Sequence, residues 1–165
     1  MAELEGARLA TLRETLEEQE RDPLPSDAEG ETRAMIRSAM AFAKDGDAAR
    51  AWALQRQVNQ AGLGGPLAEP GAAGWMYLLI VESLLGLTLQ DDVLAVAPLL
   101  PDDWHGFTVR YRHGASLYVI DVRAAEQGSL ALDGLPMPGT VIALEDDGAE
   151  HRVEVRIRQE RAAHR

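Results

Sequence analysis

Two short runs of acidic residues could take part in acid–base or metal chemistry. Asp102 and Asp103 are adjacent, and Glu145, Asp146 and Asp147 follow one another. Paired carboxyl groups can act as a general acid and a base, and carboxylate clusters can bind calcium. Asp is also a residue of tight turns, because its side chain bonds to its own backbone and tolerates sharp bends. We therefore interpret both runs as turns.

The histidines and serines show no spacing that would build a metal site or a catalytic triad. His105 and His113 fall in expected turns, and neither has a companion at the spacing that paired metal ligands require. Ser116 and Ser129 lack a visible base partner, which a nucleophilic serine needs. Cysteine is absent, so thiolate chemistry and cysteine-ligated metals are excluded. We expect no metal ion and no cofactor.

An aromatic cluster and one arginine could contact a ligand. Trp75 and Tyr77 could stack on a sugar ring, but aromatic residues that open a buried helix usually belong to the core. Arg33 could hold a phosphate group, since guanidinium matches the geometry of phosphate. A surface ion pair is the more common role for a helical arginine, and it contributes at most about 1 kcal/mol. The residues alone favour a structural role for both features.

The composition limits the classes of partner that the chain can bind. Its 165 residues include 27 acidic and 16 basic side chains, which give a net charge of −11. Binding to a nucleic acid or an anionic membrane requires clustered cations, so both partners are disfavoured. The longest apolar run, Trp75 to Val81, is much shorter than a membrane-spanning helix, and the amino terminus has no secretory pattern. We expect a cytoplasmic protein without a membrane span.

The apolar residues of the first half recur at helical spacing. Helices are predicted over Ala2–Arg21, from Ser26 to Lys44, over Ala48–Asn59 and over Gly71–Leu85. Gly86 would end the last helix, which is apolar nearly all round and should lie at the centre of the core. Glycine and proline make residues 60–70 a loop.

After Leu87 the apolar pattern changes from helical to alternating. Six strands are predicted, over residues 93–96, 107–112, 116–123, 129–133, 140–144 and 150–158. Turns are expected at His113-Gly114, at Asp133-Gly134 and at Asp146-Asp147-Gly148. Short strands at regular spacing predict an antiparallel β-sandwich. The predicted fold class is α+β, with a helical region at residues 1–88, a β-sandwich domain at residues 89–160 and a tail at residues 161–165.

A series of short motifs extends from the last predicted helix through the strands. They are Gly74-Trp75-Met76-Tyr77, Glu82-Ser83-Leu84-Leu85-Gly86-Leu87, Pro101-Asp102-Asp103-Trp104, Gly106-Phe107-Thr108-Val109, Leu132-Asp133-Gly134 and Asp146-Asp147-Gly148, with a weaker match over Thr32 to Arg50. Together these motifs resemble the carboxy-terminal part of glycoside hydrolase family ninety-four, formerly glycosyltransferase family thirty-six. That family contains cellobiose and chitobiose phosphorylases and the phosphorylase-like part of cyclic β-1,2-glucan synthases, which the chain resembles most.

The resemblance implies a fold and a reaction. Members of the family break β-glycosidic bonds with inorganic phosphate, or run the reverse reaction, in an (α/α)6 barrel that is followed by a β-sandwich. The helical region would then be a remnant of the barrel, packed on the β-sandwich. The family's general acid lies in an earlier barrel segment that we expect this chain to lack, so we assign no catalytic residue.

The resemblance also nominates three weak candidates for substrate or phosphate binding, namely Arg33, Gly71 and Trp75. Arg33 stands where relatives have a histidine after threonine. Gly71 lies between Pro70 and Ala72, where relatives have Thr-Gly-Ser, so the hydroxyl donors of that motif are missing. Trp75 follows in the family's Ala-Gly-Trp motif.

Two hypotheses of function follow, and a third stays open beside them. In the first, the chain is a truncated, non-catalytic relative that acts as an accessory or sugar-associated module. In the second, it is the carboxy-terminal piece of a split glycoside phosphorylase or glucan synthase, which completes an active enzyme with a partner barrel protein. Exposed apolar surface would favour such docking, or self-association. In the third, the sheet itself binds an oligosaccharide such as a β-glucan. Whether the chain is an enzyme is left open by these hypotheses.

Overall fold

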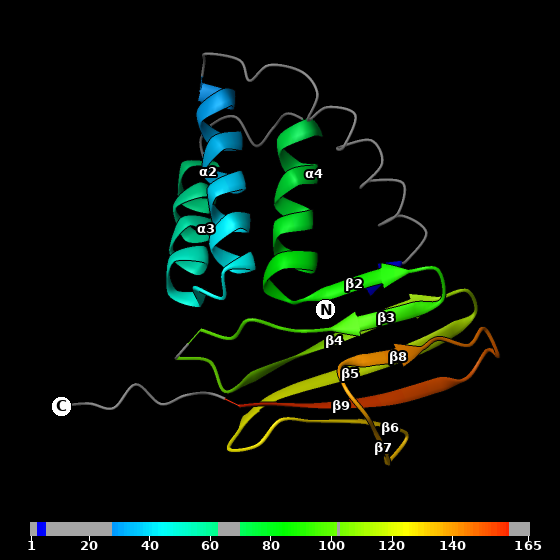
Figure 1. The fold of residues 1–165 in the computed structure, drawn as a ribbon. Helices are drawn as coiled ribbons and strands as arrows, with labels where there is room; N and C mark the ends of the chain where they lie inside the picture. Colours follow the sequence, from blue (N-terminus) through cyan, green and yellow to red (C-terminus); the bar gives the residue numbers. More distant parts are fainter. Residues whose placement is uncertain (1–2, 6–27, 63–69, 102, 159–165) are drawn as a thin grey trace.

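The computed structural model describes residues 3–5, 28–62, 70–101 and 103–158. Three α-helices occur in these ranges, α2 (Ala28–Lys44), α3 (Ala48–Gly62) and α4 (Pro70–Leu78). The last of them continues without a break into a π-helical segment, η2 (Leu79–Leu84), in which the Leu85 N–H donates to the Ile80 carbonyl at 2.7 Å. Figure 1 shows the three helices as one group on one side of the strands. Helices are therefore confirmed at the three predicted places within the described residues.

The turn between α2 and α3 follows from its sequence, Asp45-Gly46-Asp47. Gly46 has φ of +79°, a conformation that glycine adopts without strain at the end of a helix. Asp47 then caps α3, because its Oδ1 accepts the Arg50 N–H at 3.1 Å. The two helices form a hairpin and pack against each other.

Gly86 makes the junction between the helices and the strands. Its φ is +65°, and a Cβ at this position would overlap the backbone of Ala97 and Pro98. The Ala97 N–H donates to the Gly86 carbonyl at 2.8 Å, and the Leu99 N–H donates to the Leu84 carbonyl at 2.9 Å. The helix therefore ends at the predicted glycine, for two reasons: the backbone conformation and the close approach of a second backbone.

The strands form two sheets. The strands in chain order are β1 (Glu3–Glu5), β2 (Leu87–Gln90), β3 (Val93–Val96), β4 (Gly106–His113), β5 (Ser116–Ala125), β6 (Ser129–Leu132), β7 (Leu135–Met137), β8 (Val141–Ala143) and β9 (Glu150–Arg158). The larger sheet has the order β1-β4-β5-β9-β6-β7, and the smaller one has the order β2-β3-β8. Helices followed by two sheets give an α+β arrangement, while β2 and β7 are strands that the sequence pattern did not predict.

The expected antiparallel pairing is wrong for part of the larger sheet. β5 and β9 pair in parallel from Leu117↔Glu150 to Ala125↔Arg158. The chain leaves β5, forms β6, β7 and β8, and returns to the end at which β5 began, so β9 runs in the same direction as its neighbour. Alternation of side chains fixes the two faces of a strand but not the direction of its partner.

The predicted start of the first helix is also wrong. Residues 3–5 are the strand β1, which pairs in parallel with β4 from Glu3↔Arg110 to Glu5↔Arg112. Backbone groups at the outer edge of β4 gain partners in this way, and such edge pairing can outweigh helix propensity at a chain end. The rest of that predicted helix, residues 6–21, lies outside the described residues.

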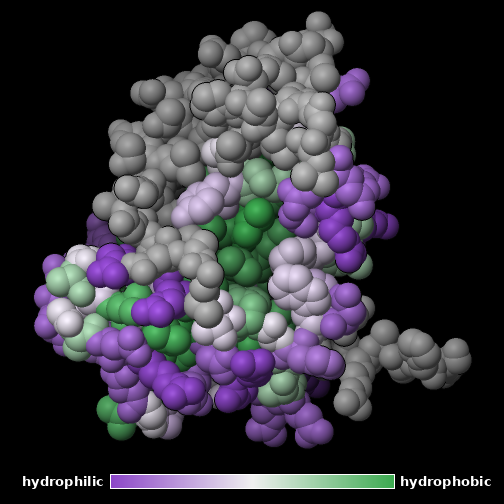
Figure 2. Space-filling model, turned by 180° about the vertical axis from the view of Figure 1, so that it is seen from behind, coloured by the Kyte–Doolittle hydropathy of each residue, from purple (hydrophilic) through white to green (hydrophobic). Residues whose placement is uncertain are grey.

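Two apolar clusters form the core. The first lies between the sheets and includes Leu94 and Ile142 from the smaller sheet and Tyr111, Ile120 and Val153 from the larger one. The second lies among the helices and contains Ile36, Ala39, Ala51, Trp52, Val58, Trp75, Met76, Leu78, Leu79 and Leu84. Figure 2, from the opposite side, shows apolar side chains between the helices and the strands, with hydrophilic residues around them.

Trp52 joins the helical cluster to the segment that follows β3. Its indole Nε1–H donates to the Leu99 carbonyl at 2.8 Å, and its ring lies 4.8 Å from the ring of Trp104. Because Trp52 belongs to α3, this contact ties the helix hairpin to the strands. Within the described ranges, no helix is long and apolar enough to cross a bilayer.

Candidate functional site

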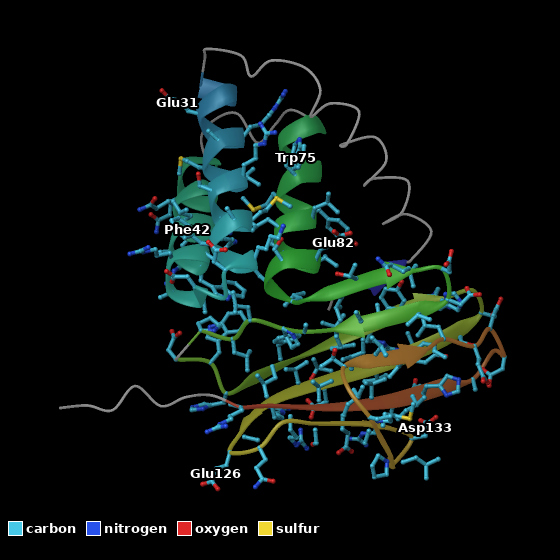
Figure 3. All side chains as sticks on the ribbon, viewed as in Figure 1. Glu31, Phe42, Trp75, Glu82, Glu126 and Asp133 are labelled. Carbon is cyan, nitrogen blue, oxygen red and sulfur yellow. The ribbon has the colours of Figure 1, made fainter. Side chains whose placement is uncertain are left out.

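The three candidate residues lie at one end of the helical group. Arg33 is in the second turn of α2, Gly71 is in the first turn of α4, and Trp75 is in the next turn of α4. α2 and α4 pack against each other and run in the same direction, so their amino-terminal turns share the end farther from the strands (Figure 1). Figure 3 labels Trp75 in this outer half of α4. Residues separated by about forty positions in the sequence are thus placed at the same end of the helices.

Trp75 is a core residue with one unusual feature. Its side chain is buried in the helical cluster, as the sequence interpretation favoured, and the residue is 7% exposed. Its Nε1–H is also buried, and no hydrogen-bond partner for it occurs among the residues that the structure describes. A buried donor without a partner costs about 1–3 kcal/mol. The Trp75 N–H, like the Tyr111 hydroxyl and Arg156 Nη1, is therefore a buried group without a hydrogen-bond partner among the described residues.

A second polar cluster lies at one end of the larger sheet, well away from Trp75 (Figure 3, near Asp133). His151, at the start of β9, faces two carboxylates. Its Nδ1 lies 2.8 Å from Asp133 Oδ2, and its Nε2 lies 3.1 Å from Asp147 Oδ1. The imidazole stacks on Tyr118 of β5, with ring centroids 4.7 Å apart. The cluster connects the β6–β7 turn, the β8–β9 loop and two central strands.

The pKa values of this cluster follow from its hydrogen bonds. The bond to Asp133 is the main reason that the pKa of His151 is raised, and burial only partly opposes it. The Arg152 N–H and then His151 lower the pKa of Asp133. The Ala149 N–H, the Ser116 hydroxyl and His151 lower the pKa of Asp147 to about 2. All three shifts favour the charged forms, so the cluster is a network of ion pairs.

The Ser116 hydroxyl is part of this network. It donates to Asp147 Oδ1 at 2.9 Å and accepts the N–H groups of Asp147 and Gly148, both at 2.9 Å. The residue is completely buried, and its Oγ bonds to no histidine. The bonds to Asp147 and Gly148 use the hydroxyl to hold the β8–β9 loop against the start of β5.

The acidic runs behave as turns where the structure describes them. Asp146 accepts the Ala115 N–H at 2.6 Å, and an added Cβ at Gly114 would overlap its carboxylate, so the two adjoining turns fit closely. Asp103 is exposed, while Asp102 lies outside the described residues. Among the residues described, no group of three His, Asp or Glu side chains could hold a metal ion.

The structure also places His105, His113 and Ser129. His105 is exposed, and His113 Nε2 lies 3.5 Å from Asp92 Oδ1. Ser129 is exposed in β6, opposite Arg156.

A groove of about 630 Å³ lies between the two sheets. Most of its lining is apolar and comes from β3, β6, β7 and β9, with Val96, Leu130, Met137 and Val155 among the side chains. Arg156 and Arg158 contribute the charged part of the wall, and Arg156 is ion-paired. Its guanidinium lies 3.7 Å from Asp121 and 3.6 Å from Glu154, so nearby carboxylates already balance its charge.

Sequence reasoning missed His151. The residue lies two positions before Val153 and four before Val155, so alternation puts it on the apolar face of the last strand. A histidine on that face, two positions from the start of a strand, needs polar partners. Asp133 and Asp147, each in a predicted turn, are those partners.

Three known proteins are similar to parts of the chain. Solabiose phosphorylase from Paenibacillus borealis is 28% identical over 90 residues, which cover 52% of this chain and 12% of that protein. N,N'-diacetylchitobiose phosphorylase from Vibrio proteolyticus is 30% identical over 90 residues and covers 52% of this chain and 11% of its own length. Cyclic β-(1,2)-glucan synthase from Rhizobium meliloti (strain 1021) is 37% identical over 62 residues, which are 38% of this chain and 2% of the synthase.

The homologous segments therefore belong to glycoside phosphorylases and a glucan synthase, the classes of relative that the motifs predict. The chain spans 12% or less of the length of each of these proteins. No family model matches it. Among solved structures, a family GH92 α-mannosidase from Bacteroides thetaiotaomicron is similar at a TM-score of 0.35 and 12% identity, over 89% of this chain and 22% of that one. A TM-score this low does not establish a shared fold.

Proposed function

We propose that the chain is a sugar-associated module related to the carboxy-terminal part of glycoside hydrolase family ninety-four, and that it binds carbohydrate without cleaving it. In this proposal, α2 to η2 correspond to the last helices of an (α/α)6 barrel, and the two sheets correspond to the β-sandwich that follows the barrel. The helical region would comprise residues 1–88, and the sandwich domain residues 89–160. Partial similarity to three carbohydrate-active enzymes is the observation that carries the proposal.

The candidate ligand site is the helix end with Arg33, Gly71 and Trp75. The Trp75 N–H has no partner among the described residues, and a sugar hydroxyl can accept it when ligand binding opens the packing around the indole. An arginine at the same end suits a phosphate or a sugar hydroxyl. The first turn of α4, which contains Gly71, has backbone N–H groups without partners inside the helix, and such groups suit a ligand oxygen.

The carboxyl groups support binding over catalysis. A general acid that protonates a glycosidic oxygen needs a raised pKa. In the described part of the chain, the carboxyls with a clear shift are Asp121, Asp133 and Asp147, and the pKa of each is lowered. For Asp121, burial acts in the opposite direction, but hydrogen bonds from Arg123 and Thr108 outweigh it. These groups are suited to hold turns and strands in place.

Calorimetric titration of the purified chain with β-1,2- and β-1,4-linked gluco-oligosaccharides, with and without inorganic phosphate, tests this proposal. Two tryptophan-to-phenylalanine variants form a matched pair. Trp75→Phe removes a donor that has no partner among the described residues, so it should weaken sugar binding and lower stability less than Trp52→Phe does. Trp52→Phe removes a donor that is bonded to Leu99, so it should lower stability and leave binding unchanged.

Absence of binding heat with every oligosaccharide would refute the binding role, and so would equal effects of the two variants on affinity. Phosphorolysis gives a separate readout. We expect no sugar 1-phosphate to be released when the chain is incubated with these glucans and phosphate. Turnover that an Arg33→Met variant abolishes would show that the chain is an enzyme.

The second candidate is that the chain completes a larger enzyme together with a partner barrel protein. Its favouring observation is that the similar proteins are whole enzymes, of which the chain matches 12% or less. Co-purification of the tagged chain with a larger barrel protein at equal amounts, together with phosphorolysis by the pair alone, would support this candidate. A chain that stays monomeric and inactive beside such proteins would reject it.

A further inference from the structure

His151 bonds to more acceptors than a neutral imidazole can serve. One ring nitrogen faces Asp133 Oδ2 at 2.8 Å, and the other faces Asp147 Oδ1 at 3.1 Å. A neutral imidazole carries one N–H, whereas the imidazolium carries two. Both contacts can therefore be hydrogen bonds only when the ring is protonated. Without that proton, a ring lone pair would face a carboxylate oxygen, and the contact would become repulsive.

We propose that His151 is a proton-operated clamp, which as imidazolium fastens the β6–β7 turn and the β8–β9 loop to the same end of the larger sheet and on losing its proton releases the loop. The two segments come from different places in the sequence. Asp133 lies between β6 and β7, and Asp147 lies between β8 and β9. Contact between them through one ring is thus long-range, and it holds only in the folded sheet.

The β8–β9 loop is the segment that is released. The contact of His151 to Asp133 is the shorter of the two, and Asp133 is fixed further by the Arg152 N–H at 2.7 Å. A neutral ring would keep its single N–H on Nδ1 and would lose the Nε2 contact. Asp147 is then held only by its bonds from Ser116 and Ala149, so these bonds open more often. Release is therefore local, and the rest of the sheet stays folded.

The groups around the His151 ring affect whether it keeps its second proton. From the turn and the loop, the facing groups are Asp133 and Asp147, and both stabilise the imidazolium. Tyr118 of β5 presents a neutral ring, and its hydroxyl bonds to the backbone of Glu145. On β9 itself, Arg152 and Glu150 are exposed, and the Arg152 guanidinium lies 3.7 Å from Glu154.

The direction of the pH effect follows from these charges. The pKa of His151 is raised above its ordinary value of 6.5, chiefly by Asp133. A histidine whose pKa is raised by folding adds its full stability at a pH below its pKa in the unfolded chain. That stability is lost as the pH rises through its pKa in the folded chain. The clamp is therefore closed at pH 6 and opens as the pH rises through the raised pKa of His151.

Hydrogen exchange measured by NMR tests the clamp on the whole chain. The reporter is the Ala149 amide, which donates to the Asp147 carboxylate at 2.9 Å. After correction for the intrinsic effect of pH, we expect its protection to fall across the titration of His151, because Asp147 loses one of the hydrogen bonds that hold it. The fall should be absent in His151→Gln, whose side chain stays neutral. His113→Gln is the matched control, since His113 also lies beside a carboxylate, and it should keep the wild-type profile.

Nitrogen-15 shifts of the His151 ring give a second reading that needs no variant. Both ring nitrogens should be protonated at pH 6, and Nε2 should lose its proton at the same midpoint as the change in Ala149 exchange. The proposal is overturned if the midpoints differ, if protection does not depend on pH, or if His151→Gln keeps the wild-type pH dependence. Asp133→Asn should move the midpoint to lower pH, and an unchanged midpoint would also contradict the clamp.

Discussion

Replacement of Gly86 by alanine should weaken the junction between η2 and the segment after β3. An L-residue at the left-handed backbone conformation of Gly86 costs about 1 kcal/mol. The new Cβ would overlap the backbone of Ala97 and Pro98, which cannot move aside as a side chain could. Relief of this overlap requires the two backbone hydrogen bonds that end on Gly86 and Leu84 to lengthen or break.

The magnitude can be worked out from these contributions. Two backbone hydrogen bonds, at about 1 kcal/mol each, add to the conformational cost and give a loss of about 3 kcal/mol in the free energy of unfolding. With a urea dependence of about 2 kcal/mol per molar, the unfolding midpoint should fall by about 1.5 M. Urea titration followed by tryptophan fluorescence and by far-UV circular dichroism measures this change.

Gly46→Ala is the matched control. Gly46 ends α2 with φ of +79°, but no atom lies within 4 Å of an added Cβ. Only the conformational cost applies there, so the loss should be about 1 kcal/mol. Equal losses at the two positions would refute the argument, because they would mean that the approach of residues 97 and 98 to Gly86 does not matter.

Three further changes should have measurable effects on stability. Trp52→Phe should lower the free energy of unfolding by about 1 kcal/mol in urea titration, because the Leu99 carbonyl loses its donor; no change would contradict the role of that bond. Ser116→Ala should cost about 2–3 kcal/mol in the same assay, since this buried hydroxyl makes three hydrogen bonds, and a loss below that of Trp52→Phe would contradict its anchoring role. The carboxylates of Asp133 and Asp147, whose pKa values are lowered in the folded chain, stabilise the fold at a pH above their ordinary pKa of 3.8. This stability is lost as the pH falls. The melting temperature should therefore drop below about pH 4, and a drop of equal size in Asp133→Asn would show that this carboxyl is not responsible.

Much of the local structure could be predicted from the sequence, because local patterns determine it. Alternation from Glu150 to Arg158 gives β9 with its bounds, and Asp133-Gly134 gives a two-residue turn with both residues at positive φ. Gly86 ends its helix as expected. In each case the signal lies within a few residues of the element that it describes.

The pairing of distant segments could not be predicted in the same way. Nothing in the pattern of β5 or β9 states that they are parallel neighbours, since side-chain alternation is the same in either direction. The strand β2 was missed because Leu87-Thr88-Leu89-Gln90 is short and directly follows a helix. The strand at residues 3–5 depends on a backbone partner, β4, which lies a hundred positions later.

The candidate sites also differ in whether a local sequence signal or a contact between distant segments defines them. Motif resemblance nominated Arg33, Gly71 and Trp75, and their role in binding stays a prediction. His151 was missed because its significance depends on two carboxylates from turns that only the folded sheet brings to it. A polar residue on the apolar side of a strand is the signal that could have identified it.

The position of β9 has a consequence for how the chain is made. β9 is synthesised after β4, β5 and β6, yet it lies between β5 and β6 in the sheet. Until residues 150–158 have left the ribosome, the edges of β5 and β6 that β9 later occupies stay without a partner, and open edges invite pairing with other chains. Release of those residues from the exit tunnel is therefore the step that closes the sheet, and a nascent chain stalled before Glu150 should be the form most prone to aggregate.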